Sequence, residues 1–462
     1  MTHKECSPAA VPVCLLLAVA LALTVPASAE WKEKVLYSFQ GGTDGSIPAG
    51  GVIFEKEGNL YGLTIYGGST ACPPGWCGTF YQLSPPPQKG GKWTETILYV
   101  FKGHNQNDGS SPSGSLISDS AGNFYGVTGY GGSGPCVLFG TATGCGTVFE
   151  LSPPAQKGGA WTETVLYNFQ GGKDGDLPTG PLVFDSTGNL YGATLFGGGK
   201  GTTCNAFYGG QCGSIFELSP PKTKRGKWTE KVLHGFAGIG AGKQYGDGAS
   251  PNGGLALDNS GAIYGTTFIG GYNCPHNSEQ GCGSVFKLRP PAAKDGTWIE
   301  QRLHIFKNGN DGAEPGAGVV IDTKGSLYGG AEGGANLCGV VFKLAVSGGG
   351  GWRETVLYSF GGNTYYYDPA VSGFDSSGNL YGTTNVGPGS LAGAIFRLKP
   401  SSRKGGTWNA SVLYGFTGGS DGRFPAATLT FDKSGDLYGA TQEGGGKGTC
   451  QGYCGTVFEV SP

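Results

Sequence analysis

One sequence element recurs seven times along the chain, and this repetition constrains the fold more than any other feature. Each copy leads from a short apolar stretch through a turn to a Leu-Tyr-Gly or similar triplet, as in residues 182–192. The tyrosines of successive copies lie between 53 and 73 residues apart. These tyrosines are Tyr61, Tyr125, Tyr191, Tyr264, Tyr328, Tyr381 and Tyr438. A period of this length indicates a repeat architecture.

Each copy contains four strand-like segments, which in the third copy are residues 180–185, 189–194, 213–218 and 228–236. Glycine and proline separate these segments, because glycine accepts a positive φ and proline cannot continue a strand ladder. The 92 glycines and the single Met disfavour helices, since a glycine inside a helix costs about 1 kcal/mol relative to alanine. The pattern therefore predicts an all-β fold, a seven-bladed β-propeller with four-stranded antiparallel blades that bury apolar surface between neighbours.

The two ends of the chain carry complementary fragments of one repeat. Residues 31–39 resemble a fourth strand with no copy before them, and residues 455–460 resemble a third strand with no fourth strand after them. We therefore expect the N-terminal strand to complete the last blade and close the ring.

The first residues have the features of a signal peptide. Lys4 precedes an uncharged apolar run of residues 11–25, and Ala27 and Ala29 occupy the positions that a signal peptidase reads. The run is shorter than the roughly 20 residues that span a bilayer. We expect residues 1–29 to be removed, residues 30–462 to form a single propeller domain without a membrane span, and the product to be secreted, either periplasmic or extracellular.

Ten of the cysteines after residue 29 form five local pairs, each in the connection between a second and a third strand. In an exported protein we expect these pairs to be disulfides. Metal binding is the alternative, but the few histidines do not cluster and no doubled Cys-x-x-Cys occurs. The pairs are Cys72/Cys77, Cys136/Cys145, Cys204/Cys212, Cys274/Cys282 and Cys450/Cys454. The remaining cysteine, Cys338, is expected to be a free buried thiol or the site of an intermolecular bond.

Charge limits the partners that the protein can have. With 31 basic and 33 acidic residues the formal net charge is −2, so the chain lacks the basic surface that nucleic-acid binding needs. We expect a monomer that binds no nucleic acid and carries no cofactor, and whose partner is an extracellular glycan or protein.

An Asp-Gly pair recurs in the link between consecutive blades, three residues before a proline. The simplest interpretation is a turn in which the aspartate caps its own backbone. The alternative is a ring of carboxylates at the channel mouth that binds a cation or a polar ligand. The weak metal candidates are Asp44, Asp108, Asp174, Asp247, Asp311 and Asp421.

Departures from the repeat are the places to look for function, because a residue repeated in every blade is usually structural. Several polar and aromatic departures gather in the last three copies, and Trp76 lies inside a paired-cysteine loop. We expect ligand binding by Glu332, Tyr365, Tyr366, Tyr367, Asp368, Gln442, Glu443 and Trp76. The alternative is surface drift.

The repeat resembles the GloVer (Gloeo/Verruco) tandem-repeat family of bacteria. The resemblance rests on an Asp-x-x-Gly-Asn-Leu-Tyr-Gly-x-Thr element, present at residues 185–194, and a following Gly-Thr-Val-Phe-x-Leu element, present at residues 146–151. It covers essentially the whole chain after residue 29. It implies that members are often exported, and it brings no catalytic residues with it.

Two functions from different classes remain. The first, which we favour, is an exported binding or interaction module that presents its loop face to a glycan or protein. The second is a propeller enzyme, a lyase, lactonase or glycan-cleaving protein, that would use Glu332, Glu443 and Asp368 as acid, base or metal ligands.

Overall fold

The computed structural model describes residues 31–462 except 70–71, 73–76, 89, 199–211, 224–225, 239–245, 272–273, 275–280, 294–295, 337, 362–367, 388–390, 404, 447–449 and 451–453. The signal peptide expected at residues 1–29 lies outside the described residues. So do four residues of the expected sites, Trp76, Tyr365, Tyr366 and Tyr367, and one expected disulfide partner, Cys204.

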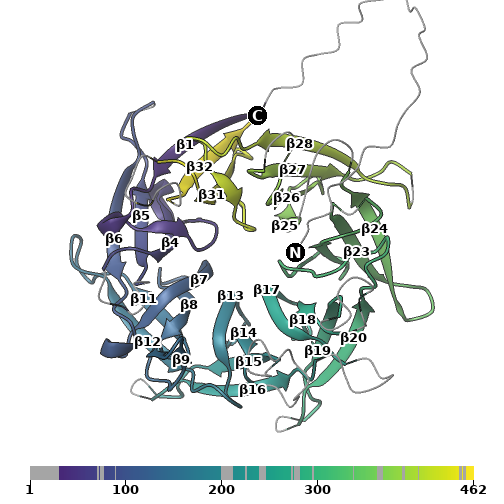
Figure 1. The fold of residues 1–462 in the computed structure, drawn as a ribbon, viewed down its shortest axis with the longest axis horizontal. Coiled ribbons are helices and arrows are strands. Elements are labelled where there is room, and N and C mark those ends of the chain that lie inside the picture. Colours follow the sequence, from purple (N-terminus) through teal and green to yellow (C-terminus); the bar gives the residue numbers. More distant parts are fainter. Residues whose placement is uncertain are drawn as a thin grey trace, which may run out of the picture.

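Seven antiparallel sheets stand around a common axis, which confirms the seven-bladed propeller (Figure 1). In each blade the strands follow one another from the axis outward. The innermost strand is interrupted in the first and last blades, so these two sheets contain five strands. Among the described residues there is no α-helix, and no helix has the length and apolarity needed to cross a membrane.

The strands of the first four blades begin and end as follows. Blade 1 contains β2 (Ser46–Pro48), β3 (Ile53–Phe54), β4 (Leu60–Tyr66), β5 (Thr79–Ser84) and β6 (Thr94–Val100). Blade 2 contains β7 (Gly109–Ser118), β8 (Phe124–Gly131), β11 (Thr147–Ser152) and β12 (Thr162–Asn168). Blade 3 contains β13 (Asp176–Phe184), β14 (Leu190–Phe196), β15 (Ser214–Ser219) and β16 (Thr229–Gly235). Blade 4 contains β17 (Ala249–Leu257), β18 (Ile263–Ile269), β19 (Ser284–Arg289) and β20 (Ile299–Ile305).

The remaining blades follow the same order. Blade 5 contains β21 (Val319–Ile321), β22 (Leu327–Ala331), β23 (Val340–Val346) and β24 (Trp352–Ser359). Blade 6 contains β25 (Ala370–Phe374), β26 (Leu380–Thr384), β27 (Ala394–Lys399) and β28 (Asn409–Gly415). Blade 7 contains β29 (Arg423–Pro425), β30 (Thr430–Phe431), β31 (Leu437–Glu443), β32 (Thr456–Ser461) and β1 (Lys32–Ser38). Outside the blades lie a small hairpin, β9 (Val137–Leu138) with β10 (Thr141–Ala142), and the 3-10 turns Gly42–Asp44, Lys56–Gly58 and His104–Gln106.

A hydrogen-bonded turn joins the first and second strands of a blade, and it explains the repeated Asp-x-x-Gly-Asn-Leu-Tyr element. In blade 3, Oδ1 of Asp185 accepts the backbone N–H groups of Thr187 and Asn189 at 2.8 and 3.0 Å. Its Oδ2 accepts the Tyr191 hydroxyl at 3.1 Å. The aspartate thus caps the turn and positions the second strand.

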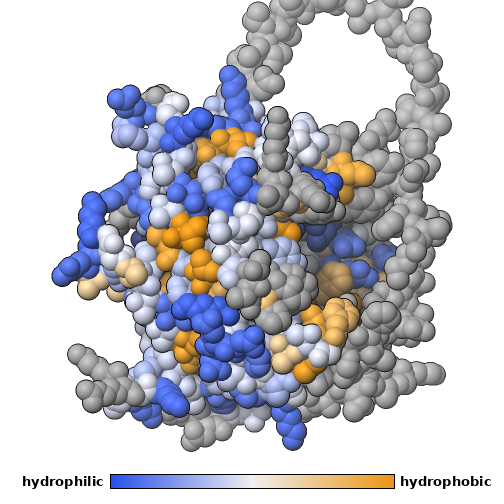
Figure 2. Space-filling view, turned by 60° about the vertical axis from the view of Figure 1, so that its left-hand side comes forward, coloured by the Kyte–Doolittle hydropathy of each residue, from blue (hydrophilic) through white to orange (hydrophobic). Residues whose placement is uncertain are grey.

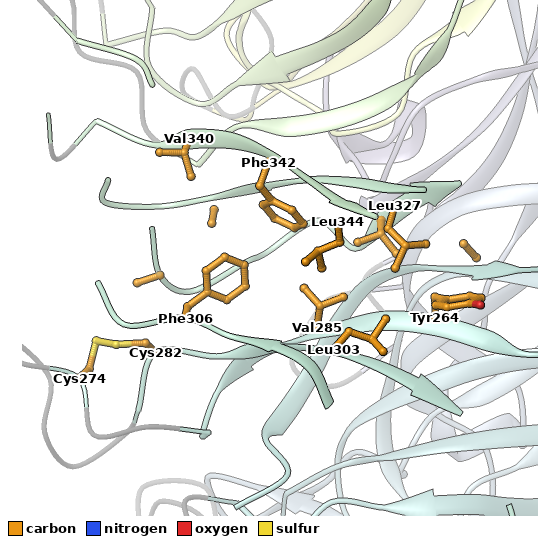
Figure 3. Packing of buried hydrophobic residues seen from close by; sticks show 14 of the residues in the cluster. Tyr264, Cys274, Cys282, Val285, Leu303, Phe306, Leu327, Val340, Phe342 and Leu344 are labelled. Atoms are coloured by element: carbon orange, nitrogen blue, oxygen red, sulfur yellow. A yellow bond between two sulfur atoms is a disulfide. The ribbon is translucent and has the colours of Figure 1, made fainter. Parts of the chain in front are cut away.

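Apolar side chains pack between blades, as the sequence predicts. The described buried residues form seven clusters, and each cluster joins two neighbouring blades. Figure 3 shows the cluster between blades 4 and 5, where Phe306 and Phe342 pack edge to face with their ring centroids 5.3 Å apart. An outer-strand tryptophan packs against each cluster. These are Trp31, Trp93, Trp161, Trp228, Trp298, Trp352 and Trp408.

Four of the five predicted disulfides are present among the described residues, with Cα–Cα distances of 5.0 to 5.4 Å. They are Cys72–Cys77, Cys136–Cys145, Cys274–Cys282 and Cys450–Cys454. Cys212 is also disulfide-bonded, and its expected partner Cys204 lies outside the described residues. Cys338 is buried and disulfide-bonded, unlike the expected free thiol. The other cysteines outside the five pairs are Cys6 and Cys14, in the segment that we expect to be removed, so the state of Cys338 after that removal stays a prediction.

The chain ends close the ring as predicted. Strand β1 pairs with β32 in antiparallel register from Lys32 opposite Ser461 to Ser38 opposite Thr456 (Figure 1). Leu36 and Phe39 are buried in the cluster between blades 7 and 1. The N-terminal strand is therefore the outermost strand of the last blade.

The outside of the ring is mixed in character. On the side formed by blades 1 and 2, hydrophobic residues lie in small patches separated by hydrophilic ones (Figure 2). Phe139 in the β9–β10 connection is 95% exposed. Scattered apolar residues are normal on a water-exposed surface, so attention turns to the axis of the ring.

Candidate functional site

Each inner strand enters the ring through a residue that precedes a proline. The seven residues at this position all have a left-handed backbone, with φ between 50° and 57°. They are Ile47, Ser111, Leu177, Ser250, Glu314, Asp368 and Phe424. In six of them the backbone N–H donates to a carbonyl of the preceding blade, for example Leu177 to Cys145 at 3.2 Å. These junctions hold the inner strands in a fixed position.

Glycines allow the inner strands of neighbouring blades to approach closely around the axis. A Cβ atom added to Gly114 would lie 2.6 Å from the carbonyl carbon of Gly180, and one added to Gly180 would lie 2.6 Å from the carbonyl oxygen of Gly253. Both glycines also have a positive φ of 74°. Any larger residue would force these strands apart.

The inner strands enclose a cavity of about 440 Å³ on the axis. All seven blades contribute to its lining, which consists mainly of Gly, Ala, Ser and Thr. Because the lining side chains are short, backbone groups and a few longer polar side chains determine the chemistry of the cavity. The longer polar side chains are Asn252, Asp368, Asn385 and Gln442.

One side of the cavity carries a row of neutral polar groups at the position after the recurrent proline. The hydroxyl groups of Ser113 and Thr179 lie 3.5 Å apart, and the Thr179 hydroxyl donates to Oδ1 of Asn252 at 3.5 Å. The same oxygen accepts the backbone N–H of Gly253 at 2.9 Å. Blades 2 to 4 therefore present hydroxyl and amide groups in a row.

The opposite side carries a carboxylate. Asp368 in blade 6 lines the cavity, and its Oδ2 accepts a hydrogen bond of 2.9 Å from Nδ2 of Asn385. Burial raises the pKa of Asp368, and the hydrogen bond from Asn385 opposes this shift. A Cβ atom added to Gly316 would lie 3.0 Å from Oδ1 of Asp368. The missing side chain at residue 316 thus leaves space beside this oxygen.

Glu332 lies near this carboxylate. Burial raises the pKa of Glu332 to about 8, with the negative charges of Asp368 and Glu314 acting in the same direction. A glutamate with this pKa is largely protonated at neutral pH and can donate a proton, whereas an ionised carboxylate can only accept one. Two of the expected catalytic candidates, Glu332 and Asp368, therefore lie within electrostatic range of each other, although only Asp368 lines the cavity.

Other expected site residues are placed differently. Gln442 lines the cavity, as a ligand-binding residue would. The neighbouring Glu443 forms an ion pair with Arg423 and is absent from the cavity lining. The hydrogen-bonding capacity of Glu443 is thus used by Arg423, which separates it from the other two candidates.

The six aspartates expected at the channel mouth lie in the links that lead from an outer strand to the next inner strand, and none of them lines the cavity. Each accepts a hydrogen bond from an aromatic side chain of an outer strand. Tyr37 donates to Asp44 at 2.5 Å and Tyr99 donates to Asp108 at 2.7 Å, while His234 bonds Asp247 at 2.9 Å. Asp174, Asp311 and Asp421 make equivalent bonds to Tyr167, His304 and Tyr414. These carboxylates cap a link between blades, as in the simpler interpretation.

The structure adds cavity residues that the sequence-based expectation missed, namely Ser113, Thr179, Asn252, Gly316 and Asn385. Asn385 could have been found, because the same second-strand position holds Ile65, Leu195 and Phe268 in other copies. A polar residue in an otherwise largely apolar column is the type of departure that identified Glu332 and Gln442.

Comparison with known families gives one match. The model described as the Gloeobacter/Verrucomicrobia repeat matches residues 24–274 and 200–458. Together the two overlapping ranges cover all seven copies of the repeat. Among curated proteins there is no match.

Solved structures with a similar chain path include two sugar-related enzymes. A PQQ-bound aldose sugar dehydrogenase from Streptomyces coelicolor is 14% identical with a TM-score of 0.41, and the alignment covers 94% of this chain and 99% of that one. An ulvan lyase from a family of polysaccharide lyases is 9% identical with a TM-score of 0.48, with 88% and 93% covered. Similarity at this level says nothing about the activity of the chain.

Proposed function

The chain belongs to the Gloeobacter/Verrucomicrobia repeat family, and on this premise we propose that it is an exported binding module whose axial cavity receives part of a glycan. Export is supported by the signal-peptide features of residues 1–29 and by four described disulfides, which are typical of oxidising compartments.

The observation that carries the proposal is the lining of the cavity. Asn252, Asn385 and Gln442 provide amide groups, and Ser113 and Thr179 provide hydroxyl groups, inside one space of about 440 Å³. Groups of these kinds donate and accept hydrogen bonds as sugar hydroxyls do, and the volume lies within the range of small-molecule sites. A folded protein partner could not enter this space, so a glycan is favoured over a protein.

A glycan screen with the full chain tests the proposal. Asn252→Ala should weaken binding of a glycan found in the screen by about tenfold, because hydrogen bonds inside the cavity are lost. Gln301→Ala is the matched control, since Gln301 is exposed on outer strand β20 and its truncation should leave the affinity unchanged. Equal effects of the two variants on affinity would contradict binding in the cavity.

A second function is a glycan-cleaving enzyme, and the proximity of Glu332 to Asp368 favours it. A protonated glutamate near a second carboxylate supplies the acid and base groups that glycosidic-bond cleavage requires. In such an enzyme, Glu332 would protonate the leaving oxygen and Asp368 would act as base or nucleophile.

Product formation separates the two functions. In an enzyme, Glu332→Gln should abolish turnover of a bound glycan, and Glu443→Gln should not, because Glu443 is paired with Arg423 away from the cavity. In a binding module, the wild-type protein should bind the glycan without any turnover.

A further inference from the structure

The axial cavity contains a carboxyl group without a matching cation. Asp368 is the single ionisable side chain among the described residues that line it, and no Lys, Arg or His is part of this lining. The nearby ionisable groups that influence Glu332 are Asp368 and Glu314, which are also acidic. A buried carboxylate is costly unless a positive partner or hydrogen bonds compensate its charge.

Asp368 has an oxygen that a ligand can reach. Its Oδ2 is occupied by the amide of Asn385, whereas Oδ1 makes no hydrogen bond to any of the described residues. Oδ1 lies beside Gly316, where a methyl group would come within 3.0 Å of it. The six other copies carry Ala, Ser, Thr or Asn at the position after the recurrent proline, so only this copy lacks a side chain there. These residues are Ala49, Ser113, Thr179, Asn252, Ala370 and Ala426.

The arrangement suits an organic cation better than a metal ion. A divalent metal with oxygen ligands needs its donor atoms at about 2.0–2.6 Å, so the donors must lie close to one another. Among the described residues, one group of three His, Cys, Asp or Glu side chains has its ligand atoms within 4.8 Å of one another. It consists of Cys136, Cys145 and Asp176, and the two cysteines form a disulfide. The carboxylates near the axis do not converge in this way, and the cavity is much larger than a single ion.

We infer that the axial cavity selects a glycan that carries an ammonium group, such as an amino sugar, and that Asp368 pairs with this ammonium through Oδ1. The inference rests on the proposed glycan-binding function and deepens it. Gly316 provides the space for the ammonium, Asn385 fixes the carboxylate through Oδ2, and the row of Ser113, Thr179 and Asn252 binds sugar hydroxyls.

Two disaccharides test the inference by isothermal titration with the full chain. One is a disaccharide of glucosamine, and the other is the matching disaccharide of glucose, which has a hydroxyl in place of each ammonium. Wild-type protein should bind the amino form more than about tenfold tighter, because loss of a buried charge partner has an effect of at least this size. Asp368→Asn should remove the preference, and asparagine tolerates the left-handed backbone of residue 368.

Two further variants keep the test specific. Gly316→Ala should weaken binding of the amino form while the carboxylate stays in place, because its Cβ atom fills the space beside Oδ1. Asn252→Ala should weaken binding of both sugars by the same factor, since Asn252 contacts neither the carboxylate of Asp368 nor the ammonium group of the ligand.

Each other outcome overturns the inference in a distinguishable way. Equal affinities for the two sugars, or a preference that persists in Asp368→Asn, would overturn the ammonium inference and leave glycan binding intact. Failure of both sugars to bind would contradict the proposed function as well. A melting temperature that rises with Ca²⁺ in wild type but not in Asp368→Asn would assign the carboxylate to a metal instead.

Discussion

Two sets of repeated carboxyl groups in this protein have pKa values shifted in opposite directions. In the hairpin turns, burial alone would raise the pKa of Asp185, but hydrogen bonds from Asn189 and Thr187 outweigh it and the pKa is lowered. In the outer strands, six glutamates each have a buried Oε1 with no hydrogen-bond partner among the described residues. They are Glu33, Glu95, Glu163, Glu230, Glu300 and Glu354, and burial raises the pKa of every one.

These glutamates predict a loss of stability as the pH rises from about 4 to about 8. Burial, and then the charge of Asp108, raise the pKa of Glu163 to about 8, whereas an unfolded glutamate has a pKa of about 4.3. The folded protein therefore binds more protons between these values, so the contribution of Glu163 to stability is complete below about pH 4 and is lost as the pH rises through 8. The melting temperature of Glu163→Gln should fall less steeply than that of wild type between about pH 5 and pH 8.

The control for this experiment is Asp185→Asn. Because the pKa of Asp185 is lowered, its contribution is present above its unfolded pKa and is lost as the pH falls through the folded one. This variant should therefore be less stable than wild type at neutral pH and should approach it in acid. Parallel plots of melting temperature against pH for wild type and Glu163→Gln between about pH 5 and pH 8 would show that Glu163 is ionised at little cost in the folded state.

Repetition determines which residue-level features the sequence can predict. Six of the seven copies show Trp-x-Glu in the outer strand. They do not show that the glutamate oxygen is buried without a hydrogen-bond partner among the described residues, as in Glu163. The position of Asp368 at the axis was likewise not predictable, because it depends on a left-handed residue before Pro369 and on the space beside Gly316. The departure itself was visible, since other copies have Asp-Gly in this link.

At the scale of elements, the disulfide-containing loop between the second and third strands of one blade forms a junction with the inner strand of the next blade. The carbonyl of Cys145 accepts the backbone N–H of Leu177, and a Cβ atom on Gly146 would lie 2.5 Å from Cδ of Pro178. In copy six, Ala392 replaces the cysteine, yet its carbonyl still accepts the N–H of Phe424 at 2.8 Å. The junction therefore forms without a disulfide.

The fold should therefore tolerate the removal of one of these disulfides. Replacing Cys136 and Cys145 by serine opens a loop with a sequence separation of 9, and on the chain-entropy model this costs about 2–3 kcal/mol. Urea unfolding should show a lower midpoint with an unchanged slope, since the same surface is exposed on unfolding. A second transition in the urea curve would contradict this account, because it would mean that the disulfide holds the two blades together.

At the scale of the whole molecule, stability depends on an unbroken ring. Seven clusters join the blades in pairs, and the one between blades 7 and 1 is formed by residues from both ends of the chain. Across the same junction, the Thr430 hydroxyl donates to the carbonyl of Val52, and Gly51 lies against the backbone of Thr428. The sequence predicted the pairing of β1 with β32, because a third strand without a fourth is recognisable, but not the glycine contacts that narrow the axis.

Deletion of residues 31–39 should lower the melting temperature by on the order of 10 °C. The deletion removes the buried side chains of Leu36 and Phe39, each worth roughly 1.5–3 kcal/mol of burial, and it exposes the edge of β32. Thermal unfolding followed by circular dichroism provides the measurement, and aggregation through the free edge should accompany it.

A circular permutant separates ring closure from the mere loss of residues. The permutant begins at Trp352 and runs to residue 462. A linker with the sequence of residues 153–160 then joins residue 462 to residue 31, and the chain ends at residue 346. Every described strand is kept in this order. Its first strand is then β24, an outer strand that pairs with β23 at the other end, so blade 5 closes as blade 7 does in the natural order. The permutant should melt within a few degrees of wild type, whereas the deletion variant should not. If the permutant were destabilised as much as the deletion variant, continuity between β23 and β24 would matter more than closure, and the ring would not be held by strand pairing between the two chain ends.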